Sequence, residues 1–128
     1  MEKIEIKGID YRLNEETLTA EVIEQENGYE GDIIIPETVV FQEVAYRVTS
    51  IRWKAFLGCK SLTSIVIPDS VTRIITAAFY GCKSLTSITF NGTKAQWQGI
   101  KLGKDWNARC PGITVHCTDG EVAEPCRW

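Results

Sequence analysis

Two adjacent segments of this chain have nearly the same sequence, and this repeat constrains the fold more than any other feature. Residues 51–67 (IRWKAFLGCKSLTSIVI) align with residues 74–90 (IITAAFYGCKSLTSITF) at a shift of 23 residues, and 11 of the 17 aligned positions are identical. A fixed period of this kind is typical of a chain that winds into successive coils, each packed on the next. We therefore expect equivalent side chains, such as Phe56 and Phe79, to lie in neighbouring layers.

Weaker copies flank the two clear ones. Upstream, residues 33–39 (IIIPETV) resemble residues 65–71 (IVIPDSV), and downstream residues 113–117 (ITVHC) alternate as a half-buried strand does. A period of 23 lies within the range of ~20–29 residues for leucine-rich repeats. The predicted fold is therefore a leucine-rich-repeat solenoid, a right-handed superhelix rich in β-structure with short helical segments. It has four strand rungs, of which the outer two are atypical, as terminal repeats usually are.

We predict a single leucine-rich-repeat domain over residues 1–128, in three parts: an N-terminal β-hairpin cap (1–31), the repeats (32–90) and a C-terminal cap (91–128). The hairpin pairs residues 9–13 with residues 18–22 around a loop at 14–17. Such a cap covers the end of the solenoid, where strand edges would otherwise be exposed.

Two further local elements follow from the pattern. Residues 39–41 and 44–46 read as a second hairpin around Gln42 and Glu43, whose residue types disfavour positive φ, so the turn type stays open. Residues 93–96 (TKAQ) fit a capping box, which predicts a short helix through Trp97 and Ile100.

The string A-F-x-G-C-x-S-L-T-S-I-x-I-P-x-S-V at residues 55–71 recurs at 78–90 without its Pro-x-Ser-Val ending. It resembles the repeat of the BspA-like leucine-rich-repeat family, and the resemblance extends over essentially the whole chain. Arg52 and Ile75 depart from the family pattern, which usually has Gly after the Ile. The resemblance implies a bacterial protein at the cell surface or secreted, with a role in adhesion to a host extracellular or cell-surface protein.

Charge and hydropathy exclude two classes of partner. The net charge is −3, from 14 basic and 17 acidic residues, and the basic residues are scattered, so we expect no nucleic-acid partner. No apolar stretch approaches the ~20 residues of a membrane span. The start, MEKIEIKG, lacks the apolar core of a secretory signal, so the protein either stays inside the cell or has lost a leader.

The sequence predicts neither an enzyme nor a cofactor or metal site. The single histidine, His116, is followed by Cys117, but successive residues of a strand point to opposite faces, so the two cannot act as base and nucleophile. No glycine-rich phosphate loop is present. The five cysteines include no C-x-x-C pair and no second histidine accompanies them, which disfavours zinc.

The cysteines and tryptophans read as structural residues. Cys59 and Cys82 share a repeat position and should stack as buried thiols, since parallel side chains would strain a disulfide. Cys110 and Cys126 fall in loop-like sequence and would pair if the protein is exported. The tryptophans at 97 and 106 are predicted core or cap residues, with ligand stacking as the alternative.

The strand pattern also defines a candidate binding surface. If Ile65 and Ile67 and their equivalents face inward, the alternate residues form two columns on the outer strand face, a usual partner site in solenoids. The candidate partner-binding residues are Ile34, Ser64, Val66, Ser87, Thr89, Thr114 and His116. The predicted function is a protein-interaction module that binds or adheres through this face. The alternative is a structural, stand-alone unit without a tight partner, whose small polar residues merely suit a solvated sheet.

Overall fold

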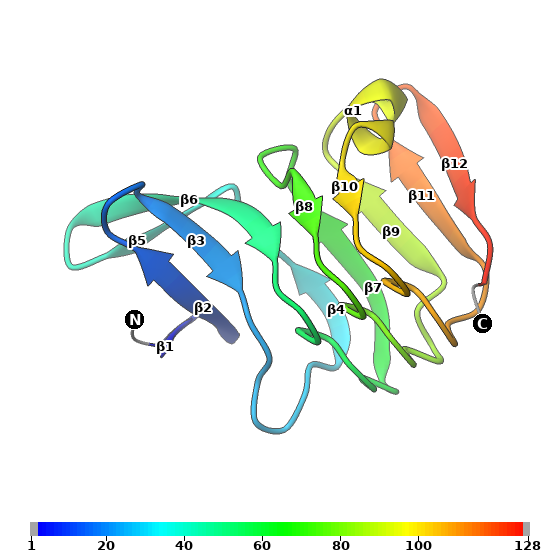
Figure 1. The fold of residues 1–128 in the computed structure, drawn as a ribbon, viewed down its shortest axis with the longest axis horizontal. Coiled ribbons are helices and arrows are strands. Elements are labelled where there is room, and N and C mark those ends of the chain that lie inside the picture. The colour runs from blue at the N-terminus through cyan, green and yellow to red at the C-terminus, as the bar shows by residue number, and fades with distance from the viewer. Residues whose placement is uncertain (1–2, 127–128) are drawn as a thin grey trace.

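The computed structural model describes residues 3–126, which form two β-sheets facing one another across a shared core (Figure 1). The first sheet has the strand order β1 (Lys3–Ile6), β2 (Ile9–Asn14), β3 (Thr19–Val22), β6 (Val44–Ile51), β8 (Arg73–Ile74) and β10 (Lys101–Leu102), with β5 (Thr38–Phe41) paired to β6. The second has the order β12 (Gly120–Glu124), β11 (Ile113–Cys117), β9 (Ser87–Phe90), β7 (Leu62–Ile67) and β4 (Gly31–Ile34). The helix α1 (Lys94–Gln98) lies beside β12 (Figure 1). The fold is therefore rich in strand and very poor in helix.

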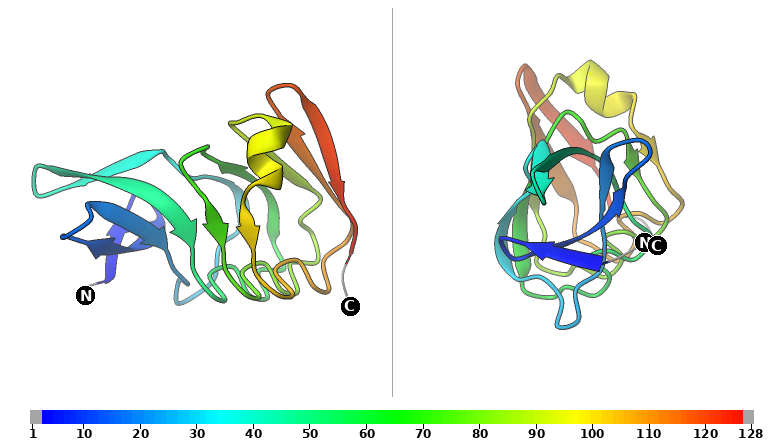
Figure 2. Two further views of the ribbon diagram at one scale, coloured as in Figure 1. Left: turned by 45° about the horizontal axis from the view of Figure 1, so that its top comes forward. Right: turned by 90° about the vertical axis from the view of Figure 1, so that its left-hand side faces the viewer.

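Each repeat contributes one strand to each sheet, so the chain winds from sheet to sheet (Figure 2). Strands of successive coils pair in parallel, and β7 pairs with β9 in the register Ile65 to Ile88 and Ile67 to Phe90. Parallel neighbours need a crossover connection, which the strand in the opposite sheet supplies here. This register is the 23-residue shift of the sequence, which confirms the predicted period.

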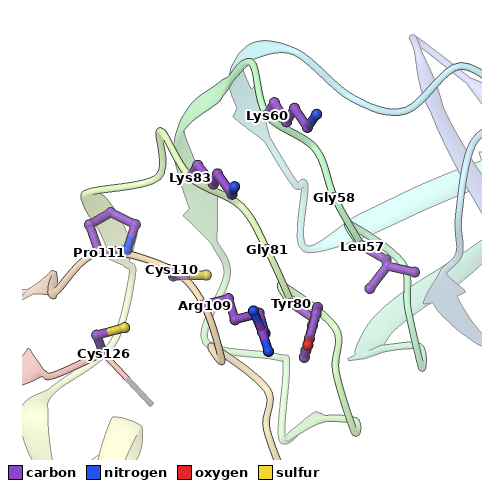
Figure 3. Close-up of a pocket in the computed structure, with 10 residues that line it drawn as sticks. All are labelled: Leu57, Gly58, Lys60, Tyr80, Gly81, Lys83, Arg109, Cys110, Pro111 and Cys126. Carbon is purple, nitrogen blue, oxygen red and sulfur yellow. The ribbon is translucent and has the colours of Figure 1, made fainter. Parts of the chain in front are cut away.

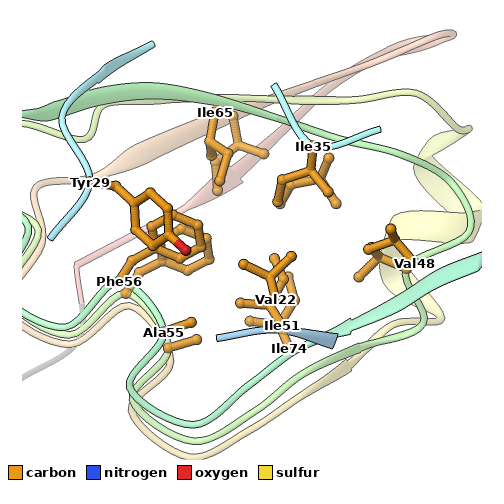
Figure 4. Packing of buried hydrophobic residues seen from close by; sticks show 14 of the residues in the cluster. Val22, Tyr29, Ile35, Val48, Ile51, Ala55, Phe56, Ile65 and Ile74 are labelled. Atoms are coloured by element: carbon orange, nitrogen blue, oxygen red, sulfur yellow. The ribbon is translucent and has the colours of Figure 1, made fainter. Parts of the chain in front are cut away.

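The core lies between the sheets and is built in layers. The rings of Phe56 and Phe79 are stacked with their centroids 4.9 Å apart, which confirms that they occupy neighbouring layers. Tyr29 continues the stack on the other side of Phe56, at 4.6 Å (Figure 4). Leu62 and Leu85 are likewise fully buried. Burial of these side chains drives the stacking, because a single coil exposes most of them to water.

The structure contains a third coil, of which the sequence comparison had identified only the strand at residues 113–117. Each coil has two turn residues with positive φ: Lys54 and Gly58 in the first, Ala77 and Gly81 in the second, and Asp105 and Arg109 in the third. The third pair follows the second by 28 residues rather than 23. Backbone hydrogen bonds between coils repeat as well: the Gly58 N–H donates to the Tyr80 oxygen of the second coil, and the equivalent Gly81 N–H donates to the Ala108 oxygen of the third. The similarity is hidden because Asn107 and Arg109 stand where the other coils have Phe and Gly.

The N-terminal hairpin is formed by β2 and β3, as predicted, with Tyr11 opposite Val22. The prediction was wrong at Leu18, which lies in the loop with φ 56° and is 48% exposed. The loop keeps its predicted four residues but is shifted by one, to 15–18, because Asn14 belongs to β2 and pairs with Thr19. The Asn14 side-chain oxygen accepts hydrogen bonds from the backbone N–H groups of Glu16 and Thr17 and holds this loop. Strand β1 adds a third antiparallel strand, and β3 joins β6 in parallel.

The second hairpin pairs β5 with β6 around a two-residue loop. Gln42 and Glu43 both adopt positive φ, 50° and 66°, so the turn is a tight one of the primed kind despite the residue types. The helix prediction is also confirmed: Thr93 is the N-cap, and both hydrogen bonds of its capping box with Gln96 are present. The helix ends at Gln98, and Ile100 follows it as a buried residue.

Candidate partner-binding face

The outer face of the second sheet carries two straight columns of side chains, which we call the strand face. Pairing of β4, β7, β9 and β11 aligns Asp32, Ser64, Ser87 and Thr114 in one column and Ile34, Val66, Thr89 and His116 in the other. All seven predicted residues are at least partly exposed and lie together on this face. The residues between them, such as Ile65 and Ile88, are fully buried. The predicted inward and outward alternation is therefore confirmed.

The first column is polar and carries a fixed negative charge at its end. The hydroxyl of Thr63 donates a 3.1 Å hydrogen bond to the Asp32 carboxylate, and the hydroxyl of Ser64 donates a second one. These two bonds lower the pKa of Asp32, the bond from Ser64 having the larger effect. The carboxylate is thus ionised at neutral pH, while Ser87 and Thr114 continue the column with neutral groups.

The second column changes from apolar to polar along the stack. Ile34 is 68% exposed, an unusual state for an isoleucine, and it lies on β4, the outermost strand of the second sheet. Val66 and Thr89 follow, and His116 ends the column with its Nδ1 2.8 Å from an oxygen of Glu121. An edge strand with an exposed apolar side chain offers both backbone groups and a contact surface to a partner.

His116 and Cys117 lie on opposite faces of β11, as the strand geometry predicts. His116 is directed to the outer face, where its Nδ1 lies next to the Glu121 carboxylate, whereas Cys117 packs against the core. Within residues 3–126 no group of three or more His, Cys, Asp or Glu side chains is arranged to hold a metal ion.

The structure adds a third cysteine to the predicted stack. Cys110 lies in a loop, as predicted, but this loop is part of the core: the residue is 2% exposed and donates a hydrogen bond of 2.8 Å from its thiol to the Phe79 carbonyl oxygen. It forms the third member of the ladder that begins with Cys59 and Cys82, both of which are buried thiols as predicted. The sequence did not show that Cys110 belongs to this ladder, since the shift from 82 to 110 differs from the first period of 23 residues. Burial raises the pKa of Cys59, so this thiol stays protonated at neutral pH.

Both predicted core tryptophans are confirmed. Trp97 and Trp106 are each 1% exposed, and their ring centroids are 5.9 Å apart. The Trp97 indole N–H donates a 2.8 Å hydrogen bond to Glu124 on β12. The alternative of ligand stacking is wrong for both residues, because neither ring is accessible.

Coils that place one strand in each sheet, with a recurring Phe, Leu and Ile core, define a leucine-rich-repeat protein. Residues 37–99 match the family model described as "BspA type Leucine rich repeat region (6 copies)". The chain belongs to the BspA-type leucine-rich-repeat family, whose members generally act as non-enzymatic protein-interaction modules.

Solved structures of bacterial leucine-rich-repeat proteins have a similar fold. A leucine rich cell surface protein from Faecalibacterium prausnitzii aligns with a TM-score of 0.68 and 24% identity, over 93% of this chain and 32% of its own. A leucine-rich repeat protein from Bacteroides capillosus gives 0.66 and 20%, over 91% and 99%. A third, from Bacteroides ovatus, gives 0.55 and 23%, over 89% and 37%. The chain thus spans about a third of the first and third of these proteins.

No curated protein matches the chain. None of the described residues belongs to a helix long and apolar enough to cross a bilayer.

Proposed function

We propose that the strand face binds a protein partner. In this proposal the stacked coils form a right-handed solenoid, with residues 1–31 as its N-terminal cap, 32–90 as repeats and 91–128, which contain the third coil, as its C-terminal cap. Residues 1–2 and 127–128 of these caps lie outside the described residues. The family's general role as a protein-interaction module supports the assignment. The parallel order of the coils supports it too, because regular stacking holds the side chains of four strands in one fixed surface.

The observation that carries the proposal is the alignment of Ile34, Val66, Thr89 and His116 in one column beside a polar one. Interfaces commonly combine an apolar contact with surrounding polar groups. Here Ile34 and Val66 supply the apolar contact, and the Asp32 column supplies the polar surroundings. The side chains also lie on strands, which positions them more rigidly than loops would.

Binding is tested by a pair of matched double variants. Val66→Lys with Thr89→Lys places two charges on the strand face, whereas Val40→Lys with Thr72→Lys makes the same changes at exposed positions elsewhere. Immobilised protein is first used to capture host extracellular proteins, and each captured protein is then purified and its affinity measured by surface plasmon resonance. We expect the strand-face variant to bind about tenfold or more weakly and the control variant to bind normally.

Two outcomes would contradict the proposal. Equal affinities of both variants would place the contact elsewhere, and the absence of any measurable partner would favour the alternative of a structural unit without a tight partner. Circular dichroism spectra of all variants establish that folding is retained.

We also propose that the protein acts at the cell surface or after secretion, in adhesion to host proteins. The likeness to a cell surface protein of Faecalibacterium prausnitzii supports this location. Antibody labelling of intact cells of the native organism tests it: labelling without permeabilisation is expected, and labelling only after permeabilisation would contradict it.

A further inference from the structure

A groove of about 820 Å³ crosses the turns of successive coils, on residues that the strand face does not use (Figure 3). We call it the turn groove. Leu57 and Tyr80, which share a repeat position, line one side of it. Lys60 and Lys83, which share another repeat position, line the opposite side (Figure 3). The stacking of coils therefore generates the groove, since each coil adds an equivalent pair of wall residues.

The floor of the turn groove is open because glycine occupies it. Gly58 and Gly81 lie between the two walls, with φ of 66° and 75° (Figure 3). The backbone conformation alone does not demand glycine, because Arg109 occupies the same position in the third coil with φ 59°. A Cβ added to Gly58 would meet no atom within 4 Å. Glycine at these two positions thus leaves space that the third coil fills.

Arg109 limits the turn groove at the third coil. Its guanidinium carbon lies 5.9 Å from the centroid of the Tyr80 ring, within the range of a cation–π contact. Pro111 lies beyond it on the lysine side (Figure 3). The groove therefore runs from the first coil to a positively charged, partly aromatic end.

The charge of the turn groove is opposite to that of the chain. Three of the ten described residues that line it are basic, namely Lys60, Lys83 and Arg109, and none of the ten is acidic. The chain as a whole carries a net charge of −3. Leu57, 42% exposed, adds an apolar side chain to the wall. A concave apolar surface with a few cations at its margin favours a ligand that combines apolar groups with negative charge.

We propose that the turn groove binds an acidic peptide segment in extended conformation. Its apolar side chains contact Leu57 and Tyr80, and its carboxylates pair with Lys60, Lys83 and Arg109. The glycine floor allows the peptide backbone to approach closely. This site is separate from the strand face, and it gives the protein a second class of contact on a different surface.

The probe is the acetylated and amidated peptide DLELD, titrated into the whole chain by isothermal calorimetry at low salt. Two control peptides separate the contributions: NLQLN keeps the shape and removes the charge, and DSESD keeps the charge and removes the apolar side chains. We expect DLELD alone to bind measurably, with an affinity that falls as salt is added. Absence of DLELD binding, or equal binding of DSESD, would overturn the proposal.

Charge reversal identifies the site. Lys60→Glu with Lys83→Glu should weaken DLELD binding roughly tenfold or more, because two attractive contacts become repulsive. The matched control, Arg73→Glu with Lys101→Glu, reverses two exposed basic residues of the first sheet and should leave the affinity unchanged. Equal losses in both variants would show that only the net charge matters.

Gly58→Arg distinguishes binding of the peptide inside the groove from nonspecific electrostatic attraction to the protein. The variant adds a positive charge, but its side chain fills the floor of the groove as Arg109 does. Weaker binding of DLELD is expected, and tighter binding would overturn the proposal. If this variant does not fold, Leu57→Ser tests the apolar wall instead, with the same expectation of weaker binding and with unchanged affinity as the contrary result. The strand-face variant Val66→Lys with Thr89→Lys should bind DLELD normally, so failure of one site is distinguishable from failure of the other.

Discussion

The thiol of Cys82 donates a 2.9 Å hydrogen bond to the carbonyl oxygen of Phe56 in the preceding coil. The same bond recurs one coil later, from Cys110 to Phe79. Each of these carbonyl oxygens also accepts a backbone N–H within its own turn, from Cys59 and Cys82 respectively, so the thiol supplies a second, buried donor from the next coil. A cysteine suits the position because it fills apolar space and still donates a weak hydrogen bond.

This relationship predicts a stability loss on removal of the thiol. Cys82→Ala should lower the free energy of unfolding by about 1–2 kcal/mol, since it removes one of the two hydrogen bonds that the Phe56 carbonyl accepts and opens a small cavity. Urea denaturation followed by circular dichroism measures the change. Cys117→Ala, at a partly exposed position, serves as control and should change stability less; equal losses would contradict the role assigned to the ladder.

Phe79 lies between Phe56 and Trp106 in the core and links the layers. Phe79→Ala should therefore cost about 3–5 kcal/mol, a large share of the stability of a domain of this size. Thermal unfolding measures it. The neighbouring Tyr80→Ala, at a half-buried position, should cost clearly less, and a comparable loss would argue against the stacked core as the main source of stability.

Tyr11 predicts a pH effect on stability. Burial raises the pKa of Tyr11 from 10.0 to about 12. Because the folded-state pKa is the higher one, the neutral form favours folding, and this contribution is complete below pH 10 and is lost as the pH rises towards 12. We expect wild-type stability to fall across this window, as measured by urea denaturation at a series of pH values.

Tyr11→Phe should weaken that alkaline loss. Among the described residues the Tyr11 hydroxyl is buried without a hydrogen-bond partner, so its removal should leave stability at pH 7 unchanged or slightly higher. Tyr29, whose pKa is also raised by burial, remains in the variant and retains its share of the pH dependence. A marked loss of stability at pH 7 would show that the hydroxyl has a partner.

Arg109 occupies a backbone conformation that disfavours side chains, with φ 59°. Arg109→Gly should raise the free energy of unfolding by about 1 kcal/mol, because glycine adopts positive φ without a steric penalty. Arg109→Ala removes the same charge without relieving the backbone, so it should not stabilise the protein. Calorimetric unfolding of the two variants provides the comparison, and equal stability would refute the conformational explanation.

The sequence predicted the local and periodic features of the fold well. Identical side chains at a constant spacing, such as Leu62 and Leu85, must have equivalent surroundings, which leaves few arrangements other than stacked coils. The capping box at Thr93 could be predicted from the sequence equally well, because both of its hydrogen bonds lie within one helical turn. The two columns of the strand face follow from the period of two in each strand, and for that reason the candidate site could be located before the structure.

Where the period breaks, the repeat no longer predicts the fold. The third coil escaped detection because its spacing changes to 28 and because Asn107 replaces the stacked phenylalanine. Pairing of β1 with β2 and of β12 with β11 was also unforeseen, since the sequence does not show which strand edges remain uncovered once the coils stack. The turn groove could not be predicted from the sequence for a related reason. Its walls come from different coils, and the glycines of its floor indicate in the sequence only that a turn is present.

By itself, then, the sequence determined that the chain coils, at what period, and which residues of each strand face inward. Those properties depend on contacts that repeat along the chain, so the environment of a residue in one copy predicts that of its equivalent in the next. Only the tertiary structure decided where the stack ends, how its edges are paired, and that Cys110 and Arg109 complete a third turn. Such features depend on contacts between segments with no sequence likeness, whose free energy is set by the surface that the finished stack leaves exposed.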